Sequence, residues 1–330
     1  MEEIKPIVQA VNSGSIKPVY LLHGEEAFFI DQLEHYLDQT LLSEDEKSFN
    51  QTIFYGKDAT ATDIINACRR FPMMAERQVV ILREAKDFGK FNDLIPYFKQ
   101  PQPTTVFIIC HKYALFKGKE VLKALDKNVE KFQSDKIKDY KLSAWIQYYL
   151  KSLNYTISHK AAEIMAESLG NDLSKIAKEV EKLKISLPEG TAITDQHIED
   201  NIGISKEFNN YELKSAISAK NEFKAYKIVH YLAANKSPMV VTLGVLYGFF
   251  SDLLRYHGLK DKSEKNVASV LKINPYFVKE YAQAARIYPM KKVSGIIETL
   301  KKTDAKGKGV GAANLSDRDL MNEMLFKIFN

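Results

Sequence analysis

The sequence is poor in cysteine. Of its 330 residues only Cys68 and Cys110 are cysteines, and neither belongs to a CxxC pair. A disulfide framework needs more cysteines than this, and a CxxC pair is the usual element of a structural metal site or a redox centre. The sequence therefore excludes a disulfide-stapled scaffold and indicates a reducing compartment.

Long apolar runs are scarce as well. The most apolar stretch, 238–254, is interrupted by Thr242, Ser251 and Asp252, so it falls short of the roughly 20 apolar residues that span a bilayer. The chain begins Met-Glu-Glu-Ile-Lys, without the basic region and apolar core of a signal peptide. We expect a cytoplasmic protein with no membrane partner, in which 238–254 is a buried helix.

The motifs of common enzyme classes are missing too. The seven histidines show no HExxH or other tight metal-ligand spacing, and no GxSxG element occurs. His23-Gly24-Glu25-Glu26 follows an apolar run where a phosphate-binding loop would stand, but it lacks the glycine spacing and the lysine, and its two glutamates would repel a nucleotide. We expect no catalytic residue, no metal and no cofactor, with a cryptic nucleotide-binding enzyme as a rival.

What is present is typical of a packed globular protein. Hydrophobic residues make up 45% and charged residues 27% of the chain, and its length predicts two or three domains. The first 140 residues alternate short apolar runs with helical patterns, as a parallel sheet with helices on its faces requires. The expected strands are 19–22, 52–55, 79–82 and 106–109, with a weaker one at 129–132.

Beyond Lys141 the strand signals stop and helical periodicity takes over. Ser143, Ser158 and Thr194 are expected helix N-caps. The segment 240–254 is apolar on most sides, so it must be covered by a bundle or by neighbouring subunits. Residues 301–311, rich in lysine and glycine, are expected to form a flexible basic loop. The predicted fold class is α/β followed by all-α.

Charge is distributed unevenly along the chain. Residues 209–330 hold 20 basic and 11 acidic residues, a net charge of +9, whereas residues 1–208 carry a net charge of −4. Two interpretations of this difference are open. The basic residues form a solvated, lysine-rich helix surface, or they bind a partner that carries phosphate groups.

Phe71-Pro72-Met73-Met74 precedes the third expected strand. Proline ends one helix, and we expect the two methionines to begin the next, where neighbouring side chains point about 100° apart. Two interpretations are open from the residues alone. The methionines fill gaps in the core, or they project outward as pliable side chains that fit an apolar pocket of a partner.

Four segments in this order resemble the family of delta subunits of the bacterial DNA polymerase III clamp loader. The resemblance runs over essentially the whole chain. It is carried by residues 18–26 (PVYLLHGEE), by 73–80 (MMAERQVV), by 169–173 (LGNDL) with Ile176 and 179–183 (EVEKL), and by 208–213 (FNNYEL).

The resemblance implies an AAA+-like domain without a functional P-loop (1–140), a helical lid domain (141–208) and a helical collar domain (209–330) that assembles with other loader subunits. In this family, delta opens the ring-shaped sliding clamp by inserting two adjacent apolar residues into a clamp pocket. By position these are Met73 and Met74, where the family often has Leu and Phe. Arg77 and Gln78 are expected to add polar contacts at the rim.

The resemblance also implies partners and a collar interface. The expected partners are the beta sliding clamp, the gamma/tau and delta prime subunits of the loader, and primer-template DNA held in the complex. For subunit packing in the collar the candidates are Leu243, Tyr247, Phe250 and Leu253, unless they form the core of their own domain. The alternative function is a free-standing DNA-binding protein with an inactive AAA+-like domain.

Overall fold

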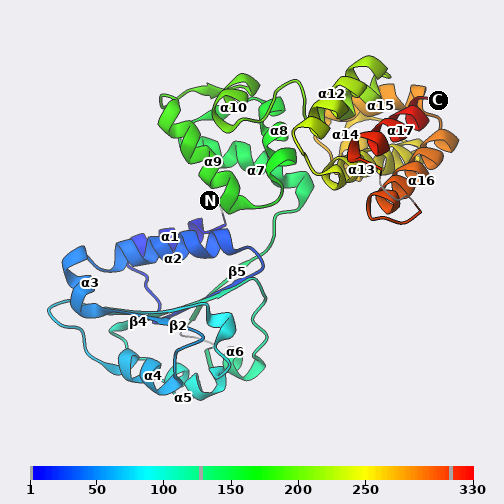
Figure 1. Ribbon diagram of the computed structural model, residues 1–330. Coiled ribbons are helices and arrows are strands. Elements are labelled where there is room, and N and C mark those ends of the chain that lie inside the picture. The colour runs from blue at the N-terminus through cyan, green and yellow to red at the C-terminus, as the bar shows by residue number, and fades with distance from the viewer. Residues whose placement is uncertain (1–2, 126–128, 312–314) are drawn as a thin grey trace. The chain divides into compact units, whose positions relative to one another are not determined.

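The computed structural model describes residues 3–125, 129–311 and 315–330. The chain divides into two compact units, Met1–Ile137 and Lys138–Asn330. The first is a sheet with helices on both faces, and the second is built from helices (Figure 1). The predicted fold class, α/β followed by all-α, is confirmed.

The sheet of the first unit has five parallel strands in the order β2-β3-β4-β1-β5. Val19 of β1 lies opposite Phe107 of β4 on one side and Val129 of β5 on the other. Each apolar run that the sequence marked, including the weaker last one, is a strand. Their bounds are β1 Val19–Gly24, β2 Gln51–Tyr55, β3 Gln78–Arg83, β4 Thr105–Lys112 and β5 Val129–Ser134.

The three inner strands are buried along nearly their whole length because helices cover both faces of the sheet. Figure 1 shows α1 and α2 on one face and α4, α5 and α6 on the other. Aromatic side chains such as Tyr97, Phe98 and Phe107 fill the core under the second face. The helices are α1 Lys5–Asn12, α2 Ala27–Leu41, α3 Glu44–Asn50, α4 Ala61–Arg69, α5 Ile95–Lys99 and α6 Lys119–Leu125.

The helices of the second unit largely follow the sequence signals. Ser158 and Thr194 accept hydrogen bonds from the Ala161 and His197 amides, so these two caps are confirmed. Ser143 is no cap, because its helix begins a turn earlier. The helices are α7 Asp139–Ser152, α8 His159–Leu169, α9 Leu173–Ser186, α10 Asp195–Ile202, α11 Asn210–Ser218, α12 Glu222–Ala234, α13 Met239–Gly258, α14 Glu264–Leu271, α15 Val278–Ile287, α16 Met290–Gly307 and α17 Asp317–Phe329.

Two local expectations for this unit are wrong. Short strands do occur beyond Lys141, since β6 (Thr156–Ile157) pairs with β7 (Ala192–Ile193), but two residues are too few to show a periodicity. Residues 301–307, expected in a loop, continue α16. Thr303 is buried on this stretch and Lys306 pairs with Glu323 of α17 at 2.8 Å, so packing overrides the lysine and glycine content.

Helix α13 is the central element of the C-terminal helices. Among the described residues it is the one helix long and apolar enough to cross a membrane by length and composition. Leu246, Phe250 and Leu253 are nevertheless fully buried against other helices of the unit, among them α15 and α16. The sequence interpretation of a buried helix is therefore confirmed.

Glu167 in α8 makes the folding stability of this unit depend on pH. Its Oε1 lies 3.9 Å from Lys214 Nζ of α11, whereas Oε2 is buried and has no hydrogen-bond partner among the described residues. Burial, opposed by Lys214, raises the pKa of this carboxyl group from 4.5 to about 7. Between these values the folded state holds a proton that the unfolded chain has released, so stability falls as pH rises through this window.

We predict that Glu167→Gln stabilises the protein at pH 8 by on the order of 2 kcal/mol and has little effect at pH 5, because the amide stays neutral at both. Thermal melting at the two pH values measures the difference. The control is Glu181→Gln, which removes an exposed pair with Lys184 and should change little at either pH. Destabilisation by Glu167→Gln at pH 8 would show that the pair with Lys214 outweighs burial.

Candidate functional site

The segment that carries the two methionines is a loop. Residues 70–77, here called the Met73 loop, connect α4 to β3 without helical structure. Helix α4 ends at Arg69, before Pro72, as predicted, but the expectation that the methionines begin a helix is wrong. Met74 has a φ of +54°, in the left-handed region that helices of L-residues avoid.

Both methionine side chains of the Met73 loop are exposed to solvent. Met73 is 61% exposed and Met74 is fully exposed, and Phe71 before them is exposed as well. The interpretation of the methionines as core fillers is therefore excluded in this chain. Large apolar side chains gathered on one exposed loop are typical of a contact surface.

Asn50, the last residue of α3, holds the loop by its backbone. Its Oδ1 accepts a hydrogen bond from the Met73 N–H at 2.6 Å, and its Nδ2 donates to the Met73 carbonyl oxygen at 2.9 Å. Asn50 itself is only 3% exposed. A single buried amide thus satisfies both backbone polar groups of Met73.

Gln78 anchors the other end of the loop. Its Nε2 donates to the carbonyl oxygens of Ala67 and Arg70, at 3.0 and 2.5 Å, and lies 2.8 Å from Thr105 Oγ1. The side chain is buried, so the expected rim contact of Gln78 is wrong: this amide faces the interior of its own chain. Arg77 remains partly exposed, and its guanidinium Nη2 lies 3.5 Å from Glu76 Oε2.

The loop after β1 occupies the place of a phosphate-binding loop, but two of its backbone amides are bonded within the chain. The Gly24 N–H donates to Ala114 O at 3.1 Å and the Glu26 N–H donates to Ser134 O at 3.2 Å. A side chain at Gly24, where φ is +146°, would overlap the Ser134 carbonyl. These backbone amides are bonded within the chain and do not point at a ligand.

Both cysteines and His23 of the first unit are buried. Burial raises the pKa of the Cys68 and Cys110 thiols, which keeps both protonated at neutral pH. Burial also lowers the pKa of His23, and its Nδ1 accepts the Phe116 N–H at 3.3 Å. The described residues contain no group of three or more His, Cys, Asp or Glu placed to hold a metal ion.

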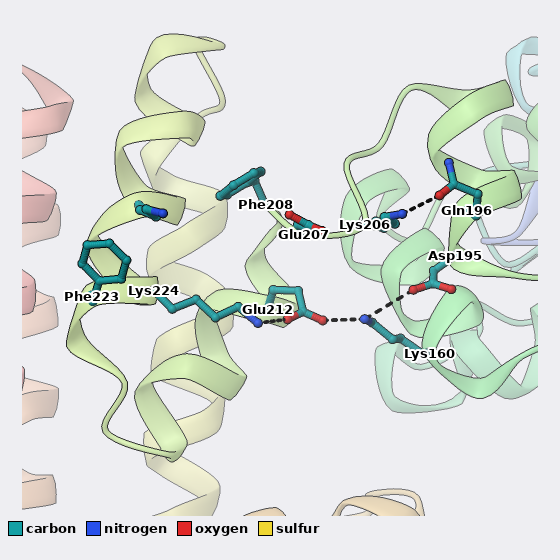
Figure 2. A pocket seen from close by; sticks show the side chains of 10 residues that line it. Lys160, Asp195, Gln196, Lys206, Glu207, Phe208, Glu212, Phe223 and Lys224 are labelled. Carbon is teal, nitrogen blue, oxygen red and sulfur yellow. Dashed lines mark hydrogen bonds and ion pairs between the residues drawn. The ribbon is translucent and has the colours of Figure 1, made fainter.

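A polar cavity of about 540 Å³ opens in the second unit, where α8 and α10 meet α11 and α12. Figure 2 shows Glu212 of α11 between two lysines. Its Oε1 lies 2.8 Å from Lys160 Nζ, which also lies 3.3 Å from Asp195, and its Oε2 pairs with Lys224. Because carboxylates already neutralise these ammonium groups, the arrangement works as a junction between helices.

Comparison with known proteins places these features in a family. The family described as DNA polymerase III, delta subunit, matches residues 20–134, and its C-terminal domain family matches residues 207–325. The chain belongs to the delta subunit family of DNA polymerase III. As a delta subunit it is an accessory subunit of that polymerase.

Individual relatives extend the match to nearly the full length of this delta subunit. It is 24% identical over 329 residues to DNA polymerase III subunit delta of Bacillus subtilis strain 168, covering 96% of this chain and 94% of the relative. A solved structure of the clamp loader delta protein of Bacillus subtilis matches with a TM-score of 0.55 at 23% identity, covering 99% of each chain. This structural match supports the fold described above.

The delta collar candidates divide into two groups. Leu243, Phe250 and Leu253 are buried within their own unit, so the expectation that they pack against another subunit is wrong for these three. Tyr247 is 53% exposed, and Val240, which lies seven residues earlier on the same face of α13, is exposed as well. Sequence periodicity identified a buried helix but could not tell which side the neighbouring helices leave open.

The Glu212 junction makes a prediction for stability. Burial alone would raise the pKa of Glu212, but hydrogen bonds from Lys160 and Lys224 hold it below its ordinary value. The stabilisation is therefore present above pH 4.5 and is lost as pH falls through the lowered pKa. We predict that Glu212→Gln destabilises the protein at pH 7 by about 1–2 kcal/mol, because Lys224 loses its carboxylate partner and Lys160 keeps only Asp195.

Urea unfolding at pH 7 and pH 4 measures this effect, which should shrink at the lower pH. Glu298→Gln removes an exposed pair with Lys302 within one helix and serves as the control. An equal loss of stability at both pH values would show that Glu212 contributes packing and no charge pairing.

Proposed function

We propose that this delta subunit binds the beta sliding clamp through Met73 and Met74 and opens the ring without hydrolysing ATP itself. The observation that supports the proposal is the exposure of two adjacent methionines on a loop whose backbone is anchored by buried amides. Arg77 is the remaining candidate for a polar contact at the rim. Residues 1–140, 141–208 and 209–330 serve as the clamp-binding, lid and collar domains.

Apolar burial supplies the energy for clamp binding. Placing both methionine side chains in a clamp pocket contributes roughly 3–6 kcal/mol before ordering costs, at about 1.5–3 kcal/mol for each buried side chain. This energy favours the open ring only to the extent that the open form of the clamp binds the loop more tightly. Delta thus acts mechanically, and no covalent step is required.

The bonded amides after β1 support the absence of ATPase activity from this chain. In our proposal the gamma/tau and delta prime subunits supply ATP hydrolysis, which governs when delta reaches the clamp. Primer-template DNA lies within the complex, and the net charge of +9 over residues 209–330 favours its phosphates. The complex works in the bacterial cytosol.

We predict that Met73→Ser with Met74→Ser weakens binding to the cognate sliding clamp at least a hundredfold, at about 1.4 kcal/mol for each factor of ten. Both side chains are exposed, so the melting temperature should not change. Surface plasmon resonance with immobilised clamp measures the affinity. Ile185→Ser, which removes an equally exposed apolar side chain from α9, is the matched control.

Equal clamp binding by the double variant would place the contact elsewhere. If the wild-type chain did not bind the clamp but bound DNA with a steep salt dependence, the free-standing DNA-binding function would replace the proposal. The charge asymmetry is the observation that keeps this second function open to test.

A separate prediction concerns nucleotides. We expect no rise in melting temperature with millimolar ATP and Mg²⁺, because a ligand stabilises a fold only by binding it, and the amides that would bind phosphate are already bonded. Differential scanning fluorimetry with ATP, ADP and Mg²⁺ alone makes the comparison. A shift specific to the nucleotide would contradict this part of the proposal.

A further inference from the structure

The end of α3 and the Met73 loop are joined by one side chain. Asn50 and Met73 are 23 residues apart in sequence, yet the Asn50 amide bonds both backbone groups of Met73. The same Nδ2 also donates to Glu46 O of α3 at 3.1 Å, which fixes the orientation of the amide. The Met73 backbone is thereby held to a helix that makes no part of the loop itself.

This anchor bears on the residue that follows it. Met74 has the left-handed backbone conformation, which is less favourable for an L-residue than the right-handed one. Asn50 bonds the backbone of Met73, and Gln78 bonds the carbonyl oxygen of Arg70 at the start of the loop. These bonds favour the loop conformation in which both methionine side chains are exposed.

We propose that Asn50 is a positioning residue that holds the Met73 loop in its clamp-binding conformation before the clamp arrives. The inference rests on the proposed function. Asn50 is buried and acts only through the backbone of Met73. Because ordering a loop on binding costs free energy, a loop that is already ordered binds its partner more tightly with the same contacts.

The test uses the full chain with Asn50→Ala and, should that variant fold poorly, Asn50→Asp, which keeps an acceptor for the Met73 N–H and loses the donor to its carbonyl. Two quantities are measured: amide hydrogen exchange at Met73 and affinity for the cognate sliding clamp. Asn266→Ala is the matched control, since Asn266 Nδ2 also donates to a backbone carbonyl, that of Asp261 at 2.7 Å, far from the loop in sequence.

We expect Asn50→Ala to speed exchange at the Met73 amide at least tenfold and to weaken clamp binding about tenfold, with Asn50→Asp between Ala and wild type. In the Met73→Ser, Met74→Ser background, Asn50→Ala should cause no further loss of affinity, because its effect passes through the methionines. A merely structural role would lower affinity in both backgrounds alike.

Each contrary result has a distinct meaning. Unchanged exchange at Met73 would show that Asn50 does not hold the loop, and an additive loss in the double-variant background would show a general structural effect; either overturns the inference. Loss of clamp binding by the methionine variant together with full binding by Asn50→Ala overturns the inference alone. Full binding by the methionine variant overturns the proposed function and, with it, the role of Asn50 in clamp binding.

Discussion

Two buried amide side chains, Asn50 and Gln78, hydrogen-bond the backbone around an exposed loop, and the candidate site depends on these bonds. Backbone N–H and C=O groups need partners wherever helices and strands do not supply them. Between α4 and β3 neither element continues, so side chains take over this role. These bonds fix the backbone of the loop while the Met73 and Met74 side chains stay exposed, which is the condition for apolar side chains to remain available to another molecule.

The sheet places the loop after β1 and the Met73 loop at opposite ends of its strands. In a parallel sheet, the loops after the strands carry function, and the loop after β1 is where phosphate would bind. Here Gly24 and Glu26 direct their amides to Ala114 and Ser134. These two amides therefore bond within the end of the sheet. The contact surface that we propose is the Met73 loop, which precedes β3 and so belongs to the opposite ends of the strands.

The parts of this structure that the sequence predicts are those with short-range causes. Runs such as 79–82 identify buried strands because burial on both faces demands continuous apolar residues, and Ser158 and Thr194 identify helix starts because their hydroxyl groups bond amides three residues ahead. The methionine pair was found from adjacent apolar residues next to a proline. Asn50 was missed, since no local pattern links it to a residue 23 positions later.

The residues that were expected to contact a partner but are buried in their own chain share one physical reason. Gln78 is polar and stands beside Arg77 in the segment for which the resemblance implies clamp contact, yet its amide bonds carbonyl groups at the end of α4 inside the chain. Leu243, Phe250 and Leu253 are apolar and their helix stands out, so an interface was inferred, yet helices of their own unit cover them. In each case the deciding partner comes from a distant part of the chain, which a local pattern does not contain.

The choice of methionine combines with the fixed backbone in a way that leucine or phenylalanine would not reproduce. A methionine side chain has three rotatable bonds and a polarizable sulfur, so it adapts to an irregular pocket, but immobilising it costs about 1.5–2 kcal/mol of rotamer entropy. Anchoring the backbone removes a cost of similar size, roughly 1–2 kcal/mol for each residue that no longer has to be ordered. In our proposal the loop therefore combines an anchored backbone with flexible side chains. The backbone entropy cost that Asn50 removes offsets the rotamer entropy that Met73 and Met74 lose on binding.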